Sequence, residues 1–295
     1  METLRQYREN LQKIYGKNDY WMVPIFRSLF SMTFLFFLSR YLQMTGKLGN
    51  PMVILSLGLL SFFLPFSFVP CLSGIFLLYY FYTQSILLLG VGALFFVFIF
   101  IIQSSVRGKY AILIAAMPLC FFFRIPYFLP LLMGLTMGLS AVISLDLGIL
   151  VYYFLRYIRE YKDKFSTGGD LVEQLDAFSG NLAPFIKNKE LFLVLLLFTL
   201  AALAIFVIRN FSFNYSFETA LVIGLCLEAT AFILYPAVGM KMNLTGELLS
   251  FLLSALLSIV ALFFWHDADY RGTEFVQFED DAYYYHVKAV PKKKA

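Results

Sequence analysis

Charged residues are scarce in this chain. Asp, Glu, Lys and Arg make up 14% of it, whereas soluble domains contain about 25%. Apolar residues make up 60%, and the mean hydropathy is +0.77. So few charges cannot cover the surface of a water-soluble protein. The composition therefore predicts a chain that lies largely in a lipid bilayer, which is its first expected partner.

Histidine and cysteine are also scarce. The two histidines, His266 and His286, both follow the last apolar segment. Cys71, Cys120 and Cys226 lie singly in apolar runs, without a Cys-x-x-Cys pair. Such isolated cysteines are typical of small apolar side chains packed between helices, and they indicate neither a zinc site nor a disulfide framework. We expect no metal and no cofactor.

The motifs of known membrane enzymes are missing. There is no His-Glu-x-x-His, no membrane histidine beside a serine and no phosphate-binding GxxxxGK[ST] loop. An aspartyl protease needs a carboxylate pair, but Asp146 and Glu228 lack the accompanying Gly-Asp motif. We therefore predict no catalytic residue and a chain that is not an enzyme. Basic residues form short clusters between apolar runs, which disfavours nucleic acid as a partner.

Long apolar runs dominate what is present. They predict an all-α polytopic membrane protein with eight or nine transmembrane helices. The expected spans are 22–42, 52–68, 71–84, 86–105, 110–123, 139–157, 190–208, 217–238 and 247–265. The nearly uncharged stretch from Pro51 to Val106 also fits two long tilted spans, which would lower the count to eight.

Prolines and glycines interrupt one apolar segment. Pro126 and Pro130 lie four residues apart, and Gly134 and Gly138 follow. Proline removes a helical hydrogen bond, and non-helical backbone inside a membrane requires protein or water to satisfy it. This pattern predicts a broken or re-entrant element near 118–138. The Gly134-Gly138 spacing favours close helix packing.

Polar segments divide the chain into parts. An amphipathic N-terminal segment (1–21) precedes a first bundle (22–157), and an amphipathic loop (158–189) precedes a second bundle (190–265) and a tail (266–295). Within the loop, a helix is expected to begin at Asp170. Basic residues flank the N-terminal segment, the Arg107–Lys109 turn and the loop. The positive-inside rule predicts that all three are cytoplasmic.

The tail alternates apolar and polar residues on both sides of Asp280 and Asp281. This pattern predicts a small β-hairpin. Because an isolated hairpin is marginal in water, we expect this one to dock on the membrane domain, a partner or a second copy. Phe278, Tyr283 and Tyr285 are the candidate docking residues.

The tail also carries a resemblance. The string from Val276 to Asp281, followed by Tyr283–Tyr285 and Val287–Pro291, resembles the terminus of an uncharacterised group of Gram-positive bacterial multi-pass membrane proteins. The match covers about 16 residues. It implies a bacterial cytoplasmic membrane and brings no function.

Charges inside spans are the candidate functional residues, because each costs at least about 2.5–3.5 kcal/mol at the bilayer centre. Asp146, Arg124 and Glu228 are the candidates for a substrate or ion pathway. A hairpin could bring Arg124 to Asp146, either as part of a site or as a structural ion pair. Glu228 is either a protonated, hydrogen-bonded side chain or a second group of the pathway.

Two functions fit these features. The first is a membrane subunit of a transport system that binds a small solute or lipid between helices and draws energy from an ion gradient or a separate ATPase. The alternative is a non-catalytic scaffold or assembly subunit that holds membrane or soluble partner proteins through the 158–189 loop and the tail. A lipid-modifying enzyme is disfavoured, because no nucleophile and base occur together.

Overall fold

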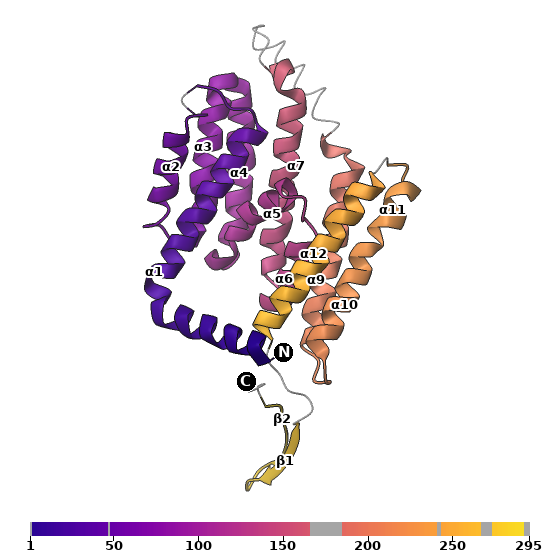
Figure 1. Cartoon of the computed structure of the whole chain (residues 1–295). Coiled ribbons are helices and arrows are strands. Elements are labelled where there is room, and N and C mark those ends of the chain that lie inside the picture. The colour runs from indigo at the N-terminus through magenta and orange to yellow at the C-terminus, as the bar shows by residue number, and fades with distance from the viewer. Residues whose placement is uncertain (1, 47, 166–184, 241–242, 267–272, 292–295) are drawn as a thin grey trace.

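The computed structural model describes residues 2–46, 48–165, 185–240, 243–266 and 273–291, and the chain is almost entirely helical apart from its tail (Figure 1). The elements are α1 (Glu2–Tyr41), α2 (Pro51–Leu60), η1 (Phe66–Phe68), α3 (Val69–Gln84), α4 (Ile86–Ser104), η2 (Gly108–Tyr110), α5 (Ile112–Phe122), α6 (Phe128–Thr136), α7 (Ala141–Phe165), α9 (Lys189–Arg209), α10 (Ser216–Ala229), α11 (Ala231–Ala237), α12 (Leu244–Trp265), β1 (Glu274–Glu279) and β2 (Tyr284–Ala289).

Within the described ranges, seven helical segments are long and apolar enough to cross a membrane. They are Lys13–Tyr41, Phe66–Gln84, Ile86–Ser104, Ala141–Tyr161, Lys189–Arg209, Ser216–Ala237 and Leu244–Trp265. Seven of the predicted spans coincide with them. The other two, 52–68 and 110–123, correspond to shorter helices.

The distribution of side chains on α12 confirms a membrane-embedded protein. Its buried residues are Ser250, Ser254 and Ser258, whereas Leu249 and Leu256 are 69% and 58% exposed. A soluble helix buries its leucines and exposes its serines. The reverse arrangement is stable when the outer solvent is lipid, where small residues allow close helix packing.

Helix α1 contains both the amphipathic segment and the first span. The backbone leaves helical geometry at Asn18, and the first part of the helix turns away across the foot of the molecule (Figure 1). Tyr7, Leu11 and Ile14 of this part are 50% exposed or more. The predicted amphipathic segment is therefore present as a helix continuous with the span.

Helix α2 is only 10 residues long and packs on α1. Ser28 donates to the Gly58 carbonyl at 2.9 Å, and Ser61 donates to the Ser31 hydroxyl at 2.8 Å. Residues 61–65 then leave the helix, with Pro65 extended before η1. The prediction of one continuous helical span over 52–68 is therefore wrong.

Helices α7 and α9 run antiparallel. Arg156, late in α7, contacts Glu190 at the start of α9, whereas Asp146, early in α7, contacts Thr199 in its middle. Helix α5 packs along α7 and runs parallel to it. Met117 lies against Gly148, and further along both helices the Phe121 ring stacks on Tyr152 with centroids 4.0 Å apart.

Helix α6 instead packs along α9 and runs parallel to it. Tyr127 packs on Phe198 before α6 begins, and Arg209 donates to the Met137 carbonyl where it ends. Helices α5 and α6 therefore form a helical hairpin. Its two ends meet, since the Gly138 N–H donates to the Tyr110 hydroxyl at 3.3 Å. Its apex lies beside Tyr152, about halfway along the apolar part of α7.

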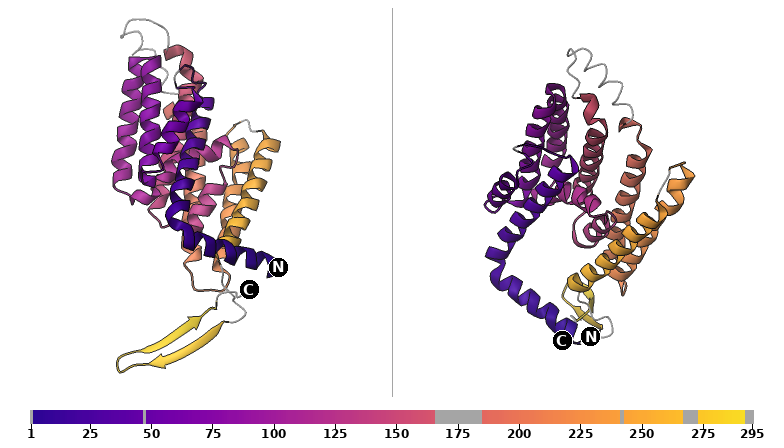
Figure 2. Two further views of the ribbon diagram at one scale, coloured as in Figure 1. Left: turned by 60° about the vertical axis from the view of Figure 1, so that its left-hand side comes forward. Right: turned by 45° about the horizontal axis from the view of Figure 1, so that its top comes forward.

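The tail forms the predicted hairpin. Strands β1 and β2 pair antiparallel, with Glu274 opposite Ala289 and Glu279 opposite Tyr284. The two strands extend beyond the foot of the helical bundle (Figure 2). The Lys288 ammonium of the hairpin donates to the Ser212 carbonyl of the bundle at 3.0 Å.

The ends of the molecule bear on the predicted topology. The N-terminal part of α1 and the β-hairpin lie at one end, whereas the end of α7 and the start of α9 lie at the other (Figure 1). The cytoplasmic assignments of the N-terminal segment and of the 158–189 loop stay predictions. The expected helix beginning at Asp170 lies outside the described residues.

Candidate functional site

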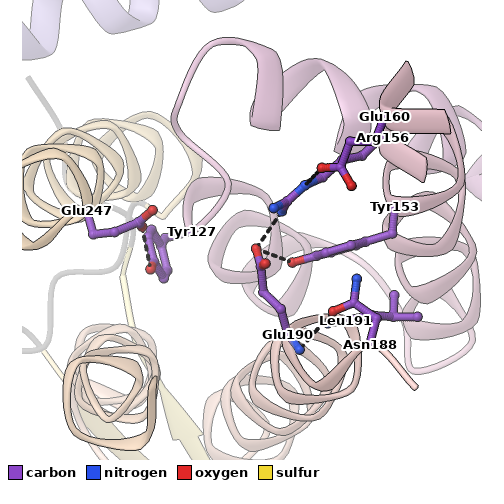
Figure 3. Close-up of polar contacts among 8 residues, drawn as sticks. All are labelled: Tyr127, Tyr153, Arg156, Glu160, Asn188, Glu190, Leu191 and Glu247. Atoms are coloured by element: carbon purple, nitrogen blue, oxygen red, sulfur yellow. Dashed lines mark hydrogen bonds and ion pairs between the residues drawn. The ribbon is translucent and has the colours of Figure 1, made fainter. Parts of the chain in front are cut away.

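A carboxylate lies between α7 and α9 near their far end. The Glu190 Oε1 atom accepts a hydrogen bond from the Tyr153 hydroxyl at 3.1 Å and another from Arg156 Nη1 at 2.8 Å (Figure 3). Asn188 caps α9 by accepting from the backbone N–H groups of Glu190 and Leu191. The cap fixes the first turn of α9, and this turn places the Glu190 carboxylate against α7.

Arg156 bridges two carboxylates. Besides Glu190, its Nε atom donates to Glu160 Oε1 at 3.1 Å, one turn further along α7 (Figure 3). The Arg156 and Glu190 side chains are each 36% exposed, and Glu160 is 56% exposed. Partial exposure lets solvent screen these pairs, so each contributes modestly to stability. Their main effect is to hold the side chains in one geometry.

A second tyrosine–carboxylate pair lies at the apex of the α5–α6 hairpin. The Tyr127 hydroxyl donates to Glu247 Oε2 at 3.1 Å, which joins the apex to the first turn of α12 (Figure 3). The Tyr127 side chain is only 3% exposed. A buried tyrosine hydroxyl needs a partner, and Glu247 supplies it.

Tyr235 of α11 lies near both pairs, within electrostatic range of Glu190 and Glu247. Tyr127 is likewise within electrostatic range of Glu228. We call these five residues, together with Tyr153 and Arg156, the polar seam.

Glu228 is the most deeply buried member of this seam. Its exposed fraction is 0%, and neither of its carboxyl oxygens has a hydrogen-bond partner among the described residues. Burying an ionised carboxylate without a partner is costly, so Glu228 stands out as a candidate functional group.

Asp146 and Arg124 do not form the predicted ion pair. Asp146 is half-buried and accepts a hydrogen bond from the Thr199 hydroxyl at 2.8 Å. Arg124 lies at the apex of the hairpin, is exposed, and has a φ of +59°. The apex is level with Tyr152, more than one turn beyond Asp146 on α7, so the hairpin carries Arg124 past its expected partner.

The helix is interrupted at the prolines, as the sequence predicts, but the interruption is shorter than expected. The interruption covers residues 123–127 and contains Pro126, rather than the whole of 118–138. Pro130 lies in the first turn of α6, where an N–H would have no helical partner anyway. The predicted break is therefore confirmed and narrowed.

The two glycines have different environments. A Cβ on Gly134 would lie 2.8 Å from the Ile205 Cβ atom, so Gly134 allows α6 to approach α9 closely. Gly138 lies beyond the end of α6 and bonds to Tyr110. Gly134 therefore serves the predicted packing role, but the two residues do not form one helical face.

Sequence reasoning missed Glu190, Glu247, Tyr127, Tyr153 and Arg156. Glu190 and Glu247 follow Asn188 and Asn243, the N-caps of α9 and α12. An acidic residue in a first turn is usually explained by the helix dipole. Only the packing of α9 on α7 and of α12 on the hairpin shows that both carboxylates face inward.

The docking residues of the tail are open to solvent. Phe278 stacks on Tyr285 with ring centroids 4.9 Å apart, and Tyr283 lies beside them. Phe278 and Tyr283 remain 54% and 68% exposed. Within the described ranges, no group of three or more His, Cys, Asp or Glu residues could hold a metal ion.

The described residues line at least two grooves on the surface of the bundle. One, of about 440 Å³, lies between α9 and α11 near Lys187 and Lys189. The other, of about 670 Å³, lies near Arg107 and Tyr110 at the foot of the hairpin.

Comparison with known proteins gives no relative. No family model, no curated protein and no solved structure matches this chain.

Proposed function

We propose that this chain is a membrane subunit of a transport system that binds a small solute or lipid between its helices. One observation carries the proposal: the apex of the α5–α6 hairpin lies about halfway along α7, beside the polar seam. Helices that are interrupted at mid-depth line the binding sites of many transporters. In this proposal Asp146, Glu228 and the Glu190 cluster line the path.

The proposed topology has eight crossings in a bacterial cytoplasmic membrane. Helix α2 with the extended residues 61–65 makes one crossing, and the α5–α6 hairpin is re-entrant. An even count agrees with the N-terminal helix and the tail lying at one end (Figure 1). We place that end in the cytoplasm, because the N-terminal segment and the Arg107–Lys109 turn are basic. The 158–189 loop then lies outside.

The energy for transport would come from an ion gradient or from a separate ATPase. Glu228 supports the first source, because a buried carboxyl without a hydrogen-bond partner among the described residues can couple proton uptake to a conformational change. Arg124 remains a candidate residue of the path, because its side chain is exposed at the apex of the hairpin.

Cysteine accessibility tests whether water reaches the path. In a chain with Cys71, Cys120 and Cys226 replaced by alanine, Thr199→Cys should react with a membrane-impermeant thiol reagent, because Thr199 faces Asp146. Leu200→Cys is the matched control, since Leu200 is 47% exposed on the lipid-facing side of the same helix. Unreactive cysteines at both positions would show a dry, packed interface between α7 and α9 and contradict a path.

Proton coupling is tested with reconstituted protein on a solid-supported membrane. A pH jump should produce a transient current that Asp146→Asn and Glu228→Gln abolish while the amount of folded protein stays the same. If the Asp146→Asn protein disappears from the membrane, the Asp146–Thr199 bond is structural. Currents equal to those of empty liposomes would contradict proton coupling.

The exposed tail supports a second candidate, a non-catalytic scaffold or assembly subunit. Large exposed apolar patches often mark interaction sites, and in the tail Phe275 and Tyr284 are 80% and 81% exposed. If the tail holds partners, deletion of 270–295 should remove proteins that co-purify with the full chain. An unchanged set of co-purifying proteins would contradict this role.

A further inference from the structure

The groove between α9 and α11 has a structural cause. Helix α10 packs closely on α9, where Gly224 lies against Ile205. The chain then turns at Thr230, whose hydroxyl donates to the Leu227 carbonyl at 2.6 Å. After this turn α11 makes few contacts with α9, so the two helices separate and leave an open channel on the lipid-facing surface.

The walls of the groove are hydrocarbon. They are formed by Phe192, Leu193 and Leu196 of α9 and by Leu234 and Val238 of α11 and its cap. Phe192 and Leu196 are 58% and 53% exposed. From Lys189 to Leu196 the groove extends about 10 Å along α9, at 1.5 Å per residue. That length suits the upper part of an acyl chain.

The mouth of the groove is basic. Lys187 and Lys189 are both exposed there, and neither pairs with a carboxylate of the described residues. The nearest acid in sequence, Glu190, turns the other way and binds Arg156. Lys189 and Arg209 bound the apolar part of α9, so the two lysines lie at the depth of lipid headgroups.

We propose that this groove binds one phospholipid with an anionic headgroup, whose phosphate contacts Lys187 and Lys189 and whose acyl chain lies along Leu196 and Leu234. Charge complementarity at the mouth selects an anionic headgroup, because lysines near a membrane surface attract anionic lipids. The apolar walls select a lipid over a free phosphate. This site lies on the outer surface and does not depend on the proposed transport path.

Native mass spectrometry of the purified chain in mixed micelles tests the site. Phosphatidylglycerol should bind more tightly than phosphatidylcholine with the same acyl chains. Lys187→Gln with Lys189→Gln should weaken phosphatidylglycerol binding by about thirtyfold. The matched control, Lys13→Gln with Lys17→Gln, removes the same charge from the other end of the molecule. Equal losses in both pairs would indicate general surface attraction and overturn the proposal.

A groove-filling variant tests the apolar half with both lysines in place. Leu234→Trp should displace the bound lipid, whereas Leu249→Trp, on the 69% exposed position of α12, should not. Leu234→Ala keeps the groove open and should still bind the lipid. This variant controls for a folding defect caused by any change at position 234. Inorganic phosphate should not displace phosphatidylglycerol. Displacement by phosphate, or retention by Leu234→Trp, would overturn the lipid assignment.

Discussion

Glu190 and Glu160 both pair with Arg156, and we expect the two ion pairs to contribute differently to the free energy of unfolding. Glu190 reaches Arg156 across the α7–α9 interface, 34 residues away in sequence, whereas Glu160 lies one turn along the same helix. The contact between α7 and α9 stabilises the packing of the two helices. The contact within α7 stabilises only that helix, which packing against its neighbours already holds in place.

We predict that Glu190→Gln destabilises the chain more than Glu160→Gln. The first should cost about 1 kcal/mol after allowance for solvent screening, and the second about 0.3–0.5 kcal/mol. Thermal unfolding in detergent measures both, and double-mutant cycles with Arg156→Gln isolate each pair. Equal effects would show that the Glu190 contact adds nothing to the α7–α9 interface.

At the residue scale, the sequence identified charges but not their partners. Asp146 and Glu228 stand out because any carboxylate within an apolar run is unusual. Thr199, the partner of Asp146, is 53 residues away, and an isolated threonine in an apolar helix carries no signal. Glu190 was hidden because an acid beside an Asn cap already has a local explanation.

At the level of elements, the α5–α6 hairpin depends on close backbone approach. A Cβ on Gly148 would lie 2.7 Å from the Met117 Cβ atom and 2.8 Å from the Leu113 carbonyl oxygen. Backbone on the facing helix cannot move aside as a flexible side chain can. Glycine at this position is therefore what allows α5 to lie along α7.

Gly148→Ala should accordingly destabilise the chain by about 1–3 kcal/mol through overpacking. Gly90→Ala on α4 is the control, because nothing lies within 4 Å of its added Cβ. Alanine has the higher helix propensity, so the control should be neutral or slightly stabilising. Thermal unfolding compares the two, and a neutral Gly148→Ala would contradict the packing of α5 on α7.

The β-hairpin has its own pH dependence. Asp280 accepts hydrogen bonds from the Ala282 N–H, the Tyr285 hydroxyl and the Tyr283 N–H, and these bonds lower its pKa below the ordinary value. A lowered folded-state pKa means that the ionised carboxylate stabilises the turn. This contribution is complete above the unfolded-state pKa and is lost as the pH falls through the folded-state pKa.

We expect the hairpin to loosen only in acid, below the usual range of aspartate. The amide resonances of Ala282 and Tyr283 in the labelled full chain should shift there as the turn opens. Asp280→Asn should remove this transition, while Asp281→Asn leaves the three bonds in place and should preserve it. A transition that survives Asp280→Asn would assign it to another group.

Elements were predictable wherever one pattern decides them. Apolar runs bounded by charges located seven spans, and strict alternation located the tail hairpin. The region 52–68 failed because its hydropathy is continuous, whereas the helix ends at Leu60 and Pro65 is extended. Hydropathy measures preference for lipid and does not reveal where a helix ends within it.

For the whole molecule, basic residues do not by themselves fix the topology, because they occur at both ends of the bundle. They cluster both near the N-terminus and around the end of α7, yet these regions lie at opposite ends of the bundle (Figure 1). The prediction assigned both to one side because charge was counted segment by segment. The number of crossings between them decides the outcome, and the α5–α6 hairpin changes that number.

Labelling of intact and permeabilised cells tests the proposed arrangement. In the cysteine-free chain, Lys17→Cys and Glu274→Cys should react with an impermeant maleimide only after permeabilisation. Lys187→Cys should react in intact cells, because it lies at the opposite end of the bundle. Different behaviour of Lys17→Cys and Glu274→Cys would contradict an even number of crossings between the two termini. A Lys187→Cys chain that reacts only after permeabilisation would contradict the placement of that end outside.

The hairpin of α5 and α6 also constrains how the protein is made. Met137, where α6 ends, binds Arg209, a residue 72 positions further along the chain. When the ribosome has completed α6, neither α7 nor α9 exists to hold the hairpin. In the proposed re-entrant topology, the contact that holds the end of α6 can therefore form only after α9 has been synthesised.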